Sequence, residues 1–243
     1  MQRILVPTDF SSVADNALNQ AIEIGSHFKS EILLYHVYHM HRKIDYDGNF
    51  PANEQPFVKN LERKMYITKR KYLEKITQNG LSIQTIVEED NIFSLFKKNA
   101  IKHDVNLIIM GSKGASGLAK ILFGSVAAVA LDWSKIPVMV VPPNVSFLPL
   151  KQIVLAIDLN EVSASILSPL QKLAFKFGAK VTILHVNANS NKDPVPRNIY
   201  LKDIETTYYE VPISKTINES INEFVEENKC DLLCMIRREK GFF

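Results

Sequence analysis

The sequence has little cysteine, little net charge and no long apolar run, and each absence excludes a class of protein. Its two cysteines, Cys230 and Cys234, fall in one predicted strand segment, which argues against a disulfide framework or a zinc site and favours a reducing compartment. No apolar stretch approaches the roughly 20 residues that span a bilayer. The formal net charge of +3 over 243 residues is too small to favour nucleic acid or an anionic membrane as the main partner. With no secretory signal before the first predicted strand, we expect a cytoplasmic protein.

The length suits two domains, and an internal repeat supports that number. Ile-Leu-Val-Pro-Thr-Asp-Phe at 4–10 aligns with Ile-Val-Leu-Ala-Ile-Asp-Leu at 153–159. At the same offset, Ile-Leu-Leu-Tyr-His-Val at 32–37 aligns with Val-Thr-Ile-Leu-His-Val at 181–186. Two matched segments with one common separation are hard to obtain by chance. The repeat and the proline-rich stretch between its copies predict a first domain, a linker and a second domain at residues 1–142, 143–150 and 151–243.

In the first repeat, short β-branched and apolar segments alternate with helical patterns, as in a parallel sheet covered on both faces. The predicted strands cover residues 2–7, 31–37, 82–88, 105–110 and 137–141. Four helices are predicted. The first follows an N-cap at Ser11, the second covers residues 57–79, the third follows an N-cap at Asn91, and the fourth begins at Gly124. This order predicts a doubly wound α/β domain with its ligand site beyond the carboxyl ends of the strands, where the strand order reverses. Residues 38–56 lack periodicity and are predicted to form a long surface loop.

The second repeat shows corresponding predicted strands near residues 152–157, 180–186, 204–210 and 231–236. After these the sequence stops without a counterpart of the last helix and strand of the first repeat. We therefore expect a degenerate and incomplete second domain. We also expect the native chain to extend past Phe243, because this end would otherwise expose two aromatic rings.

Glycine is scarce, yet four of the nine glycines fall within fourteen residues, from Gly111 to Gly124. They follow the apolar run 105–110 with the spacing G-x2-G-x9-G-S, which is neither the Rossmann fingerprint nor the Walker A loop. Gly111 and Gly114 are expected to let the loop fold closely around a phosphate chain. Gly124 and Ser125 are expected to present the unpaired N–H groups of a helix N-terminus. The alternative is a turn that needs glycine for its geometry only.

Asp9 ends the first predicted strand and precedes a helix. In a parallel sheet this position places its carboxylate in the crevice, within reach of a ribose or an adenine. The alternative is that Asp9 only caps the following turn. Asp158 takes the same place in the second repeat, which lacks the glycine cluster.

Three motifs together resemble the universal stress protein family: Val6-Pro-Thr-Asp9, Leu34-Tyr-His36-Val37 and Met110-Gly-Ser-x-Gly114-x9-Gly124-Ser-Val126. The resemblance covers residues 1–142, with a degenerate copy from about 151 onward, and its glycine pattern is the one that marks ATP-binding members. It implies an adenine-nucleotide-α-hydrolase-like fold and a stress-response module that binds ATP, or ADP or AMP, with Mg²⁺ if the phosphates are hydrolysed slowly.

The resemblance also implies nucleotide contacts for named residues. Asp9 would contact the ribose or adenine region with Pro7 and Thr8 alongside, and the Val37 backbone would contact adenine. Met110 and Gly111 would line the ribose, and the phosphates would be held by Gly114, Gly124, Ser125 and Val126. The second repeat departs from this pattern, because Ile236 replaces the counterpart of Gly111. We therefore expect no ATP binding of this kind in the second repeat.

The sequence offers no Ser-His-Asp set, no paired catalytic carboxylates and no activated cysteine, so we expect a binding or signalling module and no catalytic residues. One alternative is an adenylylating or ATP-hydrolysing enzyme that uses His39 or His41, and another is a scaffold without nucleotide. We predict no metal site at these histidines, and we expect Trp133 to be buried in the core or at a domain interface. The apolar edge segment 137–141 is expected to pair with the second repeat or with a second copy.

Gly114→Val should abolish ATP binding while the domain stays folded, because a side chain here would keep the loop away from the phosphates. Isothermal titration calorimetry measures the affinity, and circular dichroism checks the fold. An unchanged affinity would contradict the predicted loop geometry.

Overall fold

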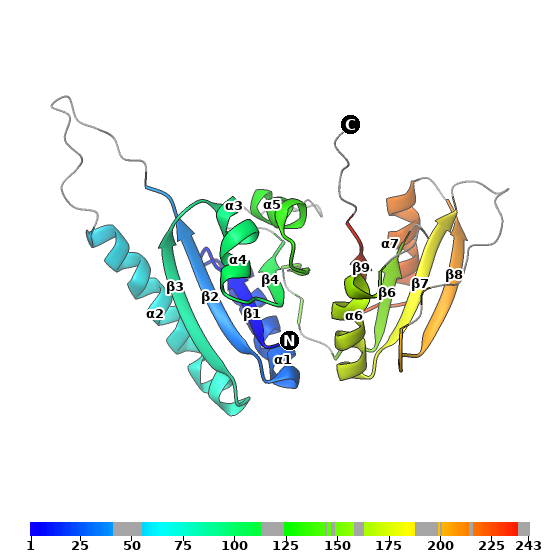
Figure 1. Cartoon of the computed structure of the whole chain (residues 1–243), viewed down its shortest axis with the longest axis horizontal. Helices are drawn as coiled ribbons and strands as arrows, with labels where there is room; N and C mark the ends of the chain where they lie inside the picture. Colours follow the sequence, from blue (N-terminus) through cyan, green and yellow to red (C-terminus); the bar gives the residue numbers. More distant parts are fainter. Residues whose placement is uncertain are drawn as a thin grey trace, which may run out of the picture. The chain divides into compact units, whose positions relative to one another are not determined.

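The computed structural model describes residues 1–40, 55–112, 124–143, 145–146, 149–157, 163–187, 199, 201–213 and 216–237. The chain divides into two compact units, residues 1–147 and 148–243. Each unit contains its own parallel sheet with helices against it (Figure 1), which confirms the predicted α/β class. Within the described ranges, no helix is both long and apolar enough to cross a membrane.

The first sheet has the strand order β3-β2-β1-β4-β5. Its strands are β1 (Arg3–Pro7), β2 (Glu31–Tyr38), β3 (Ser82–Glu89), β4 (Leu107–Gly111) and β5 (Val138–Val141). The helical elements are α1 (Ser12–Phe28), α2 (Gln55–Gln78), α3 (Ile92–Ser94), the π-helical turn η1 (Leu95–Asn99), α4 (Ala100–Lys102) and α5 (Ser125–Trp133). The helices α1 and α2 cover one face of the sheet, and the others cover the opposite face (Figure 1). The predicted double winding is therefore observed.

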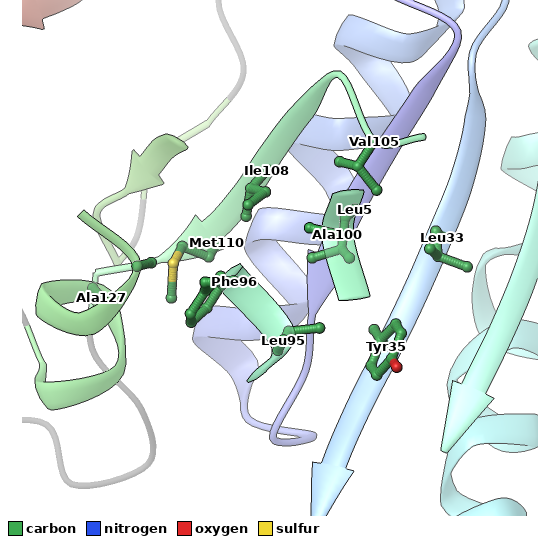
Figure 2. Packing of buried hydrophobic residues seen from close by; sticks show 11 residues of the cluster. Leu5, Leu33, Tyr35, Leu95, Phe96, Ala100, Val105, Ile108, Met110 and Ala127 are labelled. Carbon is green, nitrogen blue, oxygen red and sulfur yellow. The ribbon is translucent and has the colours of Figure 1, made fainter. Parts of the chain in front are cut away.

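The central strands β1, β2 and β4 are buried on both faces because their residues alternate between two apolar layers. Leu5 and Leu33 point to a cluster that includes Phe96 of η1 and Ala127 of α5 (Figure 2). Ile4 and Ile32 point the other way, toward Gly25 of α1, whose missing Cβ would lie 3.6 and 3.3 Å from their Cδ1 atoms. Continuous apolar runs such as 4–6 are needed where both faces are covered.

The predicted helix starts in this unit are confirmed by their caps. The Ser11 side chain accepts a hydrogen bond from the backbone N–H of Ala14, and Asn91 accepts one from Ser94. These side chains satisfy donors that the first turn of a helix leaves free. Trp133 was expected in the core or at a domain interface. It is 48% exposed at the end of α5, so it is not a core residue, and the domain interface stays a prediction.

The second sheet has the order β8-β7-β6-β9 among the described residues. Its strands are β6 (Gln152–Ala156), β7 (Lys180–Asn187), β8 (Thr206–Pro212) and β9 (Leu232–Met235). The helices α6 (Ala164–Phe177) and α7 (Ile217–Glu227) pack on its two faces. This order is that of the first sheet without the last strand.

The repeat found in the sequence is also present in the hydrogen bonds. His36 Nδ1 donates to the carbonyl oxygen of Thr8 (2.7 Å), and its counterpart His185 donates to that of Ile157 (3.2 Å). At the opposite ends of the strands, where β1 begins, Asn106 Oδ1 accepts from the backbone N–H groups of residues 2 and 3. Asp231 Oδ2 accepts in the same way from residues 151 and 152. The two copies therefore share turn geometry that no local propensity requires.

The thiol of Cys234, in β9, and the thiol of Cys230, just before β9, should differ in reactivity. Burial raises the pKa of Cys234 to about 12, and partial burial beside Asp231 also raises the pKa of Cys230. At a pH four units below its pKa, a thiol is ionised in on the order of one molecule in 10⁴. The thiolate is the reactive form.

Both side chains are partly exposed, so the difference that we expect comes from ionisation. Ellman's reagent at pH 8 should modify Cys230 faster than Cys234. Cys230→Ser should remove the faster phase, and Cys234→Ser should leave it in place. Equal rates for the two thiols in the folded protein would contradict the raised pKa of Cys234.

Candidate functional site

A cavity of about 240 Å³ lies in the first unit at the carboxyl ends of the strands. β1 pairs with β2 on one side and with β4 on the other, so this is where the strand order reverses. The chain leaves the two sides of such a point in opposite directions, which opens a crevice between the connections. The cavity is therefore at the place that the sequence predicts for a ligand.

The structure brings together nine of the ten predicted site residues around this cavity: Pro7, Thr8, Asp9, Val37, Met110, Gly111, Gly124, Ser125 and Val126. They come from four separate segments of the chain. The tenth, Gly114, lies outside the described residues. Their roles as nucleotide ligands stay predictions.

The turn after β1 is held by local hydrogen bonds. The backbone N–H of Thr8 donates to the carbonyl of Tyr35 (2.9 Å), and its Oγ1 accepts from the N–H of Phe10 (3.0 Å). Asp9 Oδ1 accepts from the N–H of Ser11 (3.0 Å). Asp9 therefore supports the turn with one oxygen, as the alternative interpretation holds, while its exposed carboxylate also lines the cavity.

Gly111 ends β4 where the first turn of α1 approaches it. A Cβ atom at this position would lie 2.6 Å from Val13 Cγ1 and 3.2 Å from the Val13 carbonyl oxygen. No side chain fits at such distances, so the packing of α1 against β4 requires glycine here. This requirement exists without any phosphate, in line with the alternative that glycine here serves geometry only, although the contact with Val13 was not predicted.

The ends of the glycine-rich segment are pinned by backbone hydrogen bonds. The N–H of Ser112 donates to the carbonyl of Val141 in β5 (2.9 Å). The carbonyl of Ser112 in turn accepts from the N–H of Gly124 (2.7 Å). The start of α5 is thereby fixed beside the end of β4. The residues between, 113–123, lie outside the described part of the chain.

The N-terminus of α5 faces the cavity with free donors. Gly124 is its N-cap and has no side chain, and the first bond within the helix runs from the N–H of Ala128 to the Gly124 carbonyl (3.0 Å). The N–H groups of Ser125, Val126 and Ala127 have no acceptor among the described residues, and all three residues line the cavity. Such a helix end carries partial positive charge and binds anions.

Seven described residues line the cavity beside the predicted ones, and two of these seven are Tyr35 and His36 of β2. The His36 ring lies 4.6 Å from the Phe10 ring, and its Nδ1 bonds the turn after β1. Both residues are in the quoted strand motif. The alternation of side chains along β2 puts Tyr35 on the face of Val37 and could have marked it as a lining residue, but it puts His36 on the opposite face. Ile92 of α3 and Leu95 of η1 complete the apolar side.

The fully buried Tyr35 belongs to a network of hydrogen-bonded polar side chains. The Tyr35 hydroxyl donates to Glu88 Oε2, and Asn99 Nδ2 donates to the same Tyr35 oxygen (3.2 Å), to Glu88 (3.0 Å) and to Asp90 Oδ2 (3.3 Å). Although partial burial raises the pKa of Asp90, the N–H of Asn91 and the Asn99 amide lower it overall. The network fixes Tyr35 against η1. Its members are far apart in the sequence, and no local pattern predicts it.

The second unit has a larger residue at the counterpart of Gly111. Ala156 of β6 pairs with Met235 of β9, and continuing the register of β1 and β4 pairs Pro7 with Met110 in the first unit. Met235 therefore corresponds to Met110, and Ile236 to Gly111. Ile236 packs against the core cluster that includes Leu167 of α6. α6 begins at Ala164, three residues later than the repeat predicts from the start of α1. The counterpart of Val13, residue 162, lies outside the described residues.

Comparisons with known proteins agree with this geometry. Residues 1–142 match the model of the universal stress protein family. Universal stress proteins MJ0531 and MJ0577 of Methanocaldococcus jannaschii are each 29% identical to this chain over 142 and 153 residues, covering 58% of this chain and 81% and 94% of the relatives. A universal stress protein from Archaeoglobus fulgidus shares the fold over 96% of this chain and 86% of its own, with a TM-score of 0.75 and 22% identity.

Gly111→Ala should destabilise the first unit by about 1–3 kcal/mol, because the added methyl group overpacks the contact with Val13. Urea unfolding followed by circular dichroism measures the change. Adding Val13→Ala should recover part of the lost stability, since Val13 Cγ1 makes the shortest contact. A stability of Gly111→Ala equal to that of the wild type would show that α1 does not pack this closely.

Proposed function

This chain belongs to the universal stress protein family, and from that premise we propose that its first unit binds one adenine nucleotide. ATP is the proposed ligand, with ADP and AMP as alternatives, and the protein acts as a nucleotide-dependent binding or signalling module in a stress response in the cytoplasm. The observation that carries the proposal is the convergence of nine predicted residues from four chain segments on one cavity.

The phosphate end of the ligand is assigned to α5. Three N–H groups without a described acceptor, those of Ser125, Val126 and Ala127, line the cavity at the helix start. Backbone donors of this kind bind phosphate without a lysine at a Walker position. The hydrogen bond between Ser112 and Gly124 holds them in place before any ligand binds. This preorganisation favours affinity because the donors need no reordering.

The adenosine end of the ligand is assigned to the turn after β1 and the end of β2. Val37 and Met110 supply apolar surface, and the exposed carboxylate of Asp9 is a hydrogen-bond acceptor for ribose hydroxyls. This division places neutral donors at one end and an acceptor with apolar contacts at the other. It matches the polarity of a nucleotide along its length.

A binding module is favoured over an enzyme by what lines the cavity. Hydrolysis of ATP needs a residue that positions or deprotonates water. The described lining residues that could do so are Asp9 and His36, and each is tied to the turn after β1 through one atom, Asp9 Oδ1 to the N–H of Ser11 and His36 Nδ1 to the carbonyl of Thr8. Only Asp9 Oδ2 and His36 Nε2 are left for such a role. The enzymatic alternative depends on His39 at the end of β2 and on His41, which lies outside the described residues. Pairing of β5 with a second repeat or a second copy also stays a prediction; β5 is an edge strand of its sheet.

Calorimetric titration of the purified chain with ATP tests the proposal, together with mass spectrometry of any nucleotide released on denaturation. We expect one site per chain. No adenine nucleotide in the denatured protein and no heat of binding after dialysis would remove the proposal.

Ser125→Pro tests the role of α5 more sharply. Proline at the first helical position lacks an N–H, and its fixed φ suits a helix start. Gly124, at φ −59° and ψ 159°, already has the extended conformation that a residue before proline adopts. The variant should therefore remove one phosphate donor and leave α5 intact. We expect the ATP affinity to fall by about ten-fold or more, the loss of a hydrogen bond to a charged group, and the adenosine affinity to stay unchanged.

Ser125→Ala is the matched control, since it removes the hydroxyl but keeps the backbone N–H. An equal loss of ATP and adenosine affinity in Ser125→Pro would mean that the helix start does not face the phosphates. So would an ATP affinity equal to that of the wild type.

A further inference from the structure

The two helical walls of the cavity also meet on its outer side. Ile92 of α3 and Leu95 of η1 line one wall, and Val126 and Ala127 of α5 line the other. α3 and η1 pack directly against α5. Any molecule in the cavity therefore acts on the spacing between these two walls.

On the outer surface, a pair of exposed rings bridges the same two elements. The ring of Phe93 of α3 meets the ring of Trp133 of α5 edge to face, with centroids 5.8 Å apart and an interplanar angle of 80°. The ammonium group of Lys97 of η1 lies 5.5 Å from the centre of the Trp133 ring. Edge-to-face aromatic pairs and cation–π contacts at these distances are attractive. The rings are 47% and 48% exposed, so burial in the core does not explain their arrangement.

We propose that Phe93, Lys97 and Trp133 form an outer clamp that sets the spacing of the cavity walls, which makes them positioning residues for the bound nucleotide. This inference rests on the proposed function, because it concerns the affinity of that same site. None of the three side chains lines the cavity, so the clamp acts through α3, η1 and α5.

The shape of α5 makes such coupling effective. The helix has nine residues, so Ser125 at its start and Trp133 at its end are about 12 Å apart along its axis. The proposed phosphate donors are at one end of this short rod, and the clamp is at the other. A ligand that draws the N-terminus of α5 toward the cavity tilts or shifts the end that carries Trp133. By linkage, a change in the clamp must alter the affinity for the ligand in return.

Trp133 is the only tryptophan of the chain, so its fluorescence reports the clamp directly. We expect titration with ATP to change the Trp133 emission with the same midpoint as the calorimetric titration. Phe93→Ala should weaken ATP binding by about five-fold or more, the lower range of allosteric couplings, and should reduce the emission change. Phe93→Tyr keeps a ring at this position and should restore both.

Matched controls separate the clamp from general effects on stability. Phe175→Ala removes another exposed ring, on α6 of the second unit, and Lys102→Gln removes an exposed charge on α4. Both should bind ATP as the wild type does, whereas Lys97→Gln should weaken binding in the same direction as Phe93→Ala. Thermal unfolding of each variant shows whether the first unit remains folded.

The outcomes are distinguishable from a failure of the proposed function. Calorimetric ATP binding without a change in Trp133 emission, and with wild-type affinity in Phe93→Ala and Lys97→Gln, would overturn the clamp and leave the nucleotide site intact. If calorimetry detects no ATP binding to the wild type, the proposed function fails and the clamp fails with it.

Discussion

The first unit depends on a central strand that is paired on both sides. β1 bonds β2 along one edge and β4 along the other, and its residues Ile4, Leu5 and Val6 are fully buried between two helical layers. β1 ends at Pro7, level with Tyr35 of β2, whereas β2 continues to Tyr38. The chain turns out of the sheet at Thr8, whose N–H donates to the carbonyl of Tyr35. The connections on its two sides run to opposite faces, and the cavity is the space left between them.

One strand position distinguishes the two copies of the repeat. In the first copy, Val13 of α1 rests against Gly111, and α1 begins directly beyond the β1 turn. In the second copy, the larger Ile236 occupies the corresponding position and packs against the core, and α6 begins later. The hydrogen bond from the histidine of the second strand to the end of the first strand is nevertheless kept in both copies. This bond therefore does not depend on the glycine.

Strands, helix caps and the location of the site follow from local rules that operate in this sequence. Buried parallel strands have continuous apolar sequences. Ser11 and Asn91 precede helical patterns, as N-cap residues do. Ligands bind where the strand order reverses. The prediction that the strand before Gly111 begins at Val105 was two residues early, because Asn106 uses its side chain to bond the N–H groups at the start of β1.

What sequence reasoning missed depends on residues that meet only in the folded chain. The bonds of Asn99 to Tyr35 and Glu88 join three elements, and Asn99 reaches them from a π-helical turn. The prediction of a core position for Trp133 failed for a related reason. An apolar side chain near a helix end is equally compatible with the core and with a surface contact. Here Phe93 and Lys97, more than thirty positions earlier, decide for the surface.

The chemistry of the cavity explains why binding and release suit it better than turnover. Among the described residues, its proposed anion-binding end consists of backbone N–H groups, whose partial charges are modest and fixed in place, and no lysine lines the cavity. Fixed dipoles hold a ligand in one geometry and respond mainly to the position of the helix that carries them. In this fold that helix, α5, is short and is held at its start by Ser112 and at its end by Phe93 and Lys97. A site built in this way converts occupancy into a small displacement of one helix, which is the property that a nucleotide-dependent module requires.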